Sequence, residues 1–124
     1  MLILLLALAN GMADHLHLYF LIRWLDIPMH ILGGFCIAIS ALTLYFLPIR
    51  RVTSEHSGMF IFTLSISTAL FLGLVWEIYE YLADTVVVSY GDQVGDTLKD
   101  LFDDFLGSLI AGTLFLWGGY NDRY

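Results

Sequence analysis

The chain has 124 residues, of which 59% are hydrophobic, and it combines a mean hydropathy of +0.79 with a formal charge of −7. A domain of this size buries only about 60–70% of its surface, so a water-soluble core cannot hide this much apolar surface. Such an apolar chain is not intrinsically disordered either. Only five Lys and Arg residues are present, too few for a nucleic-acid partner.

Long uncharged runs predict helices that cross a membrane, because a span needs roughly 20 apolar residues. Residues 27–49 and 57–76 carry no formal charge, and the run 105–121 reaches the required length if its helix begins near Asp96. We therefore expect an all-α integral membrane protein that forms one transmembrane domain over residues 1–124. Its bundle of about four helices should use the segments 1–20, 27–49, 57–83 and 96–119.

The first segment has two interpretations. Residues 1–9 are wholly apolar, and the small residues around Gly11 would fit a signal-peptide cleavage site after residue 13. A signal peptide has positively charged residues before its apolar run, but here no Lys or Arg precedes that run. We expect a retained helix, with cleavage as the alternative. Its bend towards a membrane interface is indicated by Asn10 and Gly11, followed by Asp14, His15 and His17.

The few cations predict the orientation in the cell (inner) membrane. Arg50 and Arg51 follow the second segment and mark a cytoplasmic loop by the positive-inside rule. Arg123 then also falls inside, whereas Arg23 and Lys99 fall near the outer side. In this orientation the acidic ends of the helices face the extracytoplasmic side.

Acidic residues gather at one end of the predicted bundle. They open the second segment, close the third and open the fourth, and alternating helix directions bring these positions to the same membrane surface. The residues concerned are Asp26, Glu77, Glu80, Asp96, Asp100, Asp103 and Asp104.

Helical spacing places these acids on faces that continue into small residues. At about 100° per residue, Asp26 shares a face with His30 and then Gly33 and Gly34. In the third segment Glu77 and Glu80 follow a stripe that contains Ala69 and Gly73, and in the fourth the acids lead to Gly107 and Ala111. Small residues allow close helix packing in lipid, so the acidic faces should point into the bundle.

Ordinary capping explains some of these acids. Asp26 before Pro28 resembles an N-cap, Asp96 is equally a helix cap or a member of the cluster, and Asp92 is expected to be a solvated loop charge. Capping does not explain acids one or two turns inside a span, where a bare carboxylate costs several kcal/mol. That description applies to Glu77, Glu80, Asp100 and Asp104.

A bound cation would neutralise such a cluster. Carboxylates with one imidazole suit Mg²⁺, Mn²⁺ or Ca²⁺ and also admit Zn²⁺ or Fe²⁺, while the lone Cys36 provides no thiolate site. No organic cofactor is evident. His30 and Glu77 are the candidate catalytic residues. The predicted metal ligands are Asp26, His30, Glu77, Glu80, Asp96, Asp100 and Asp104.

Three strings along the chain resemble the VanZ-like superfamily of small bacterial membrane proteins, and its YjdF-type branch most closely. They are Asp26-Ile-Pro-Met-His30, Trp76-Glu77-Ile-Tyr-Glu80, and the acidic run from Gly95 to Gly107. Two departures, Ile27 where Lys is common and Asp104 where Asn is usual, put a glycopeptide-resistance role in doubt. The resemblance implies a membrane protein with these acids in its site and names no reaction.

Three functions fit this pattern. The first is a cation-dependent site that acts on a lipid-linked or envelope substrate, with the ion polarising a phosphoryl oxygen or activating water. The second is a cation or proton pathway, and the third is a non-catalytic membrane component whose acids are structural or dock a partner. Whether the protein is an enzyme is left open by the residues alone. Four short helices expose much lateral surface, so a homo-oligomer is a further expectation.

Overall fold

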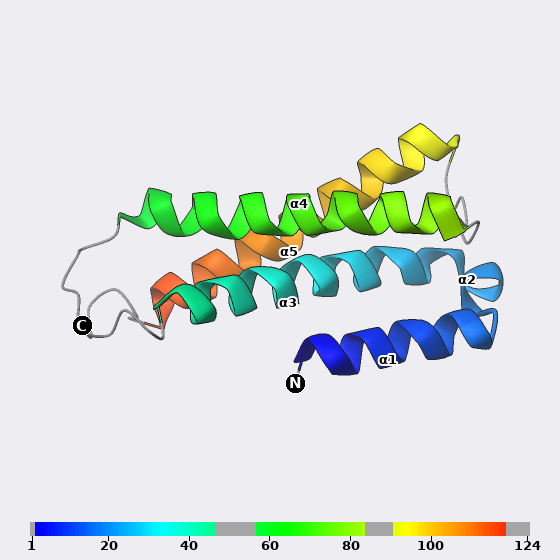
Figure 1. Cartoon of the computed structure of the whole chain (residues 1–124), viewed down its shortest axis with the longest axis horizontal. Coiled ribbons are helices and arrows are strands. Elements are labelled where there is room, and N and C mark those ends of the chain that lie inside the picture. The colour runs from blue at the N-terminus through cyan, green and yellow to red at the C-terminus, as the bar shows by residue number, and fades with distance from the viewer. Residues whose placement is uncertain (1, 47–56, 84–90, 119–124) are drawn as a thin grey trace.

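The computed structural model describes residues 2–46, 57–83 and 91–118, and every secondary-structure element within these ranges is a helix. The loop with Arg50 and Arg51, and also Arg123, lie outside the described residues, so the orientation stays a prediction. Three long helices run side by side: α3 (Asp26–Phe46), α4 (Gly58–Ala83) and α5 (Gln93–Trp117) (Figure 1). The contact between α3 and α5 is the most extensive.

Two stretches are long and apolar enough to cross a membrane. They are Arg23–Phe46, with a mean hydropathy of 1.8, and Gly58–Ala83, with 2.0. The helix α5 is of similar length, but residues 96–104 include five charged side chains. With this many charges, α5 does not count among the membrane-capable helices. Two membrane-capable helices are therefore observed where about four were expected.

The expected first segment, 1–20, is not one continuous helix. α1 (Leu2–His15) contains 14 residues, about 21 Å at about 1.5 Å per residue, which is short of the roughly 30 Å hydrocarbon core. His17 then adopts a left-handed backbone with φ of 53°, which interrupts the helix before α2 (Leu18–Leu21) and the 3-10 turn η1 (Arg23–Leu25). This break turns the chain so that α1 packs back along α3.

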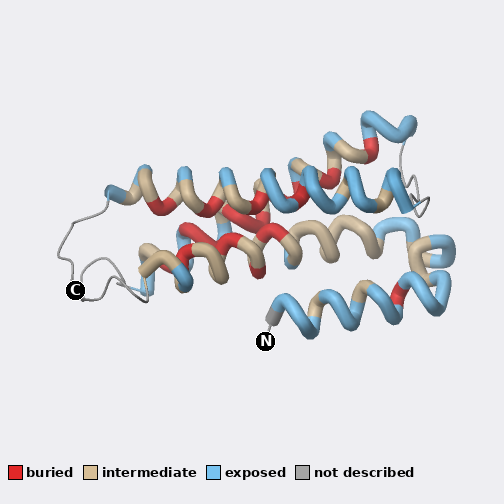
Figure 2. The backbone as a smooth tube through the Cα atoms, viewed as in Figure 1, coloured by how far each residue is buried: buried red, intermediate tan, exposed pale blue. Residues whose placement is uncertain are grey.

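Burial divides the bundle into a tight centre and an exposed flank. Buried positions gather where α3, α4 and α5 cross, whereas α1 is mostly exposed (Figure 2). An apolar cluster of Leu42, Ile61 and Phe115 packs between the three long helices, away from their acidic ends. Of the small residues expected at helix contacts, Gly33 is half-buried and the others are buried: Gly34, Ala69, Gly73, Gly107 and Ala111.

Glycine lets α3 and α5 touch backbone to backbone. A Cβ atom on Gly34 would lie 2.2 Å from the carbonyl oxygen of Asp104, and one on Gly107 would lie 2.0 Å from that of Ile31. Such distances are far inside van der Waals contact. The crossing therefore requires glycine on both helices, and it fixes the height at which the acidic residues of α5 face α3.

Candidate functional site

The imidazole of His30 lies at the centre of the acidic end of the bundle. Its Nε2 atom is 3.5 Å from Asp26 Oδ1, 3.8 Å from Asp100 Oδ2 and 3.9 Å from Glu77 Oε1. Its Nδ1 atom is 3.6 Å from Asp104 Oδ2. Three helices thus place four carboxylates around one ring, and each distance is longer than a good hydrogen bond.

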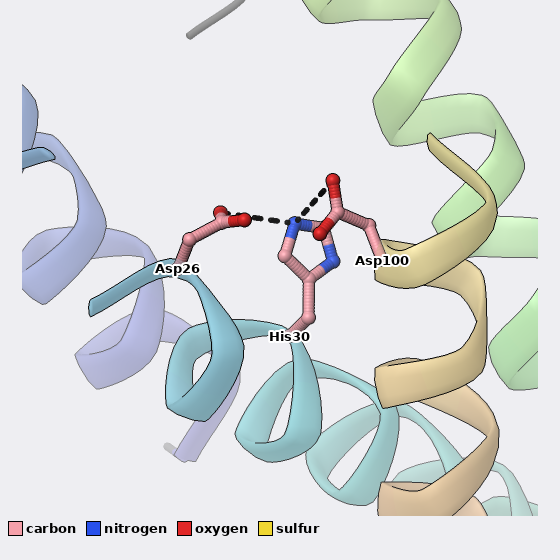
Figure 3. Close-up of side chains that lie close together, drawn as sticks. All are labelled: Asp26, His30 and Asp100. Atoms are coloured by element: carbon pink, nitrogen blue, oxygen red, sulfur yellow. Dashed lines mark ion pairs between the residues drawn. The ribbon is translucent and has the colours of Figure 1, made fainter. Parts of the chain in front are cut away.

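Asp26, His30 and Asp100 form the most compact group. One ligand atom from each lies within 4.8 Å of the other two (Figure 3). Two ligands on opposite sides of an ion are separated by about twice the metal–oxygen bond, roughly 4–5 Å for Mg²⁺ or Ca²⁺. The three side chains therefore already have the spacing of a coordination shell.

Two buried carboxylate oxygens in this cluster have no hydrogen-bond partner among the described residues. They are Glu77 Oε1 and Asp104 Oδ2, the same atoms that face the two nitrogens of His30. The side chain of Asp104 is only 4% exposed. Buried polar atoms are normally hydrogen-bonded, so these two oxygens are exceptions within the described residues.

Lys99 is the cation that reaches the cluster from α5. Its Nζ atom is 2.9 Å from Asp26 Oδ2 and 3.3 Å from Asp103 Oδ2, and it also contacts Asp100 Oδ1. Asp26 and Asp100 thus each turn one oxygen to Lys99 and the other to His30. The ammonium group holds both carboxylates in place and leaves one oxygen of each directed at the imidazole.

Replacing Lys99 tests this arrangement. We expect Lys99→Met to lower the unfolding free energy without metal by about 1–3 kcal/mol, because it leaves partly buried carboxylates uncompensated. The stabilisation gained on adding Mn²⁺ should grow, since a competing positive charge is gone. Thermal unfolding in detergent, with and without Mn²⁺, measures both effects. Arg23→Met, at an exposed position, is the control, and an equal response of the two variants would contradict the role of Lys99.

The other predicted site residues are placed differently. Glu80 and Asp96 line a cavity together with Asp26, His30 and Asp100 but are not among the carboxylates within ion-pair distance of His30. Asp92 is exposed, as expected of a solvated charge, and it is also the N-cap of α5, because its Oδ1 accepts a 2.8 Å hydrogen bond from the backbone N–H of Gly95. Asp96 lies within the first turn and is buried. Asp26 is the first residue of α3, and its side chain pairs with His30 and Lys99.

Sequence reasoning missed Thr97. Its hydroxyl donates a 2.8 Å hydrogen bond to Glu77 Oε2, which leaves Oε1 directed at His30. It also did not anticipate that Asn10 accepts a hydrogen bond from the Tyr19 hydroxyl and so joins α1 to α2. A polar threonine inside the acidic turn was the available signal for the first contact. Nothing in the spacing of Asn10 and Tyr19 predicts the second.

The match to known families covers residues 1–121. The chain belongs to DUF2238, described as a predicted membrane protein family. No curated protein and no solved structure matches it. With the two apolar helices, this match confirms the expectation of an all-helical membrane protein that lies in a lipid bilayer.

Proposed function

We propose that this DUF2238 protein binds a divalent cation at the acidic end of its helix bundle. The observation that carries the proposal is the pair of buried, unpartnered oxygens, Glu77 Oε1 and Asp104 Oδ2, beside the compact group of Asp26, His30 and Asp100. A cation would satisfy the Glu77 oxygen and neutralise carboxylates that are costly to bury. Carboxylate oxygens with one imidazole favour Mg²⁺, Mn²⁺, Ca²⁺ or Zn²⁺.

The two sides of the imidazole have different roles in this proposal. The Nε2 side, which faces Asp26, Asp100 and Glu77, binds the ion. The Nδ1 side faces Asp104 Oδ2 at 3.6 Å, and this carboxylate orients the ring in the way that carboxylates support metal-bound histidines elsewhere. Asp104 is then a positioning residue rather than a ligand. Glu80 and Asp96 border the site.

We further propose that the bound ion takes part in a reaction on a lipid-linked or envelope substrate. The support for this is a site that opens among apolar helices, where a substrate from the bilayer can reach it. The resemblance to VanZ-like and YjdF-type bacterial membrane proteins concerns the same acids but names no reaction. An ion held here supplies a Lewis acid for a phosphoryl oxygen. Glu77, held by Thr97, is the candidate general base. We also propose that the acidic cluster faces the extracytoplasmic side of the inner membrane and that the protein forms a homo-oligomer.

Binding of Mn²⁺ to purified protein in detergent tests the site, with loss of the free-ion electron paramagnetic resonance signal as the measurement. We expect Asp100→Asn and His30→Ala to weaken binding at least tenfold. Asp103→Asn is the matched control, because this buried acid contacts Lys99 but does not face His30. Absence of binding at millimolar Mn²⁺, Mg²⁺, Ca²⁺ and Zn²⁺ would refute the proposal and leave the acids a structural or proton-conducting role.

A further inference from the structure

A cavity of about 760 Å³ adjoins the acidic cluster and is bounded by α1, α3, α4 and α5. This volume is in the range of ligand pockets, roughly 300–1,000 Å³. Six acids from the three long helices line it, and Asp14 of α1 makes a seventh. The six are Asp26, Glu77, Glu80, Asp96, Asp100 and Asp104.

The walls of the cavity change from acidic to apolar along the helices. In α1 the lining runs from Asp14 to Ile3, and in α3 it runs from Asp26 to Ile37, a distance of about 16 Å in each case. In α4 it runs from Glu80 to Leu72. The acidic ends of α3 and α4 lie together, because Asp26 and Glu77 both face His30. The cavity thus offers one polar region and one hydrocarbon-lined region.

The charge of the polar region selects the ligand. His30 is the one basic side chain among the described residues that line the cavity, against seven carboxyl groups. Lys99, which pairs with Asp26 and Asp100 without lining the cavity, adds one positive charge, and a single divalent cation adds two. The acidic side chains still outnumber the positive charges. A headgroup with only negative charge is disfavoured there, whereas a protonated amine finds carboxylate acceptors.

We propose that this cavity binds an amphiphile whose headgroup carries a protonated amine, with its hydrocarbon chain along Ile3, Ile37 and Leu72. The inference rests on the proposed function, because the same cluster holds the cation, and it names the substrate class of that site. The amine lies towards Asp14 and Glu80, at the edge of the cluster. Any phosphate of the headgroup lies towards the ion. The apolar wall from α4, one of the two membrane-capable helices, is suited to a ligand that arrives from the bilayer.

Quenching of Trp76 tests the inference, since this residue lines the cavity and the other two tryptophans are Trp24 and Trp117. In a Trp24→Phe/Trp117→Phe background in dodecyl maltoside, the probes are lysophosphatidylethanolamine and lysophosphatidic acid with the same brominated chain. We expect the amine probe to quench at a concentration at least tenfold lower. Asp14→Asn/Glu80→Gln should reduce that preference severalfold. Asp103→Asn, whose side chain does not line the cavity, should retain it.

Equal quenching by the two probes would overturn the inference, as would quenching unchanged by Ile37→Phe, which narrows the apolar region. All measurements are made first with a chelator present. Mn²⁺ is then titrated without amphiphile. A headgroup preference without Mn²⁺ binding would refute the cation site alone. Mn²⁺ binding without a headgroup preference would refute the amphiphile alone.

Discussion

Replacing Gly34 or Gly107 with alanine should lower the unfolding free energy by roughly 1–3 kcal/mol or more, the usual cost of overpacking. The added methyl groups would meet the carbonyl oxygens of Asp104 and Ile31, at 2.2 and 2.0 Å. Both obstacles are backbone atoms, which cannot rotate aside, so α3 and α5 must move apart. Alanine gains about 1 kcal/mol of helix propensity over glycine, too little to compensate.

The neighbouring Gly33 is the matched control for this prediction. A Cβ atom there would lie 3.6 Å from Asp104 Oδ1, an ordinary contact, so Gly33→Ala should unfold at the same temperature as the wild type or a higher one. Thermal unfolding in detergent, followed by circular dichroism, measures all three variants. Equal stability of Gly33→Ala and Gly34→Ala would show that the close crossing of α3 and α5 is not what holds the bundle.

Gly73→Ala should weaken Mn²⁺ binding by about 10–100-fold, the usual cost of disturbing a residue that orients a metal ligand, while the bundle stays folded. A Cβ atom at this position would lie 2.2 Å from Asp104 Oδ2, the oxygen that faces His30 Nδ1. That oxygen is at the end of a side chain, so the carboxylate can rotate away. The imidazole would then lose the group that orients it.

Gly58→Ala provides the control on the same helix, because its Cβ would only touch a leucine methyl at 3.7 Å. The measurement is Mn²⁺ affinity, with the unfolding temperature of each metal-free variant recorded alongside. If the Mn²⁺ affinity of Gly73→Ala is within twofold of that of the wild type, Asp104 does not orient His30 for metal binding. Asp104→Asn, which keeps the shape of the side chain, should reproduce the loss, since an amide is a weaker acceptor for the imidazole N–H.

The helices and the common end of their acids are predictable from sequence, because both depend on local periodicity. Uncharged runs mark α3 and α4, and i, i+4 spacing places Asp26 beside His30. The polar residues up to His17 predict a bend in the first segment, but its exact position does not follow from them, since a left-handed backbone is uncommon at any single non-glycine residue. The membrane-crossing character of α5 is also ambiguous by composition, because the acids that form the site lower its hydropathy.

The division of roles within the cluster depends on tertiary contacts that no spacing rule contains. Lys99 takes one oxygen each from Asp26 and Asp100, and these acids are far apart in the chain. Thr97 fixes Glu77 across two helices in the same way. Which nitrogen of His30 faces which carboxylate follows only from the crossing of α3 and α5. The sequence predicts which residues form the cluster, whereas the packing of the helices determines which of them contact one another.

The backbone contact at Gly34 links ligand binding to helix association. The carbonyl that Gly34 meets belongs to Asp104, so the residue whose carboxylate faces His30 Nδ1 also lies where α5 contacts α3. A ligand that binds only when α3 and α5 are packed together must stabilise this helix pair by its own binding free energy. In the proposed cation site, metal binding and the close packing of α3 against α5 are therefore thermodynamically coupled. Removal of the ion would weaken this packing before any of the helices unfolds.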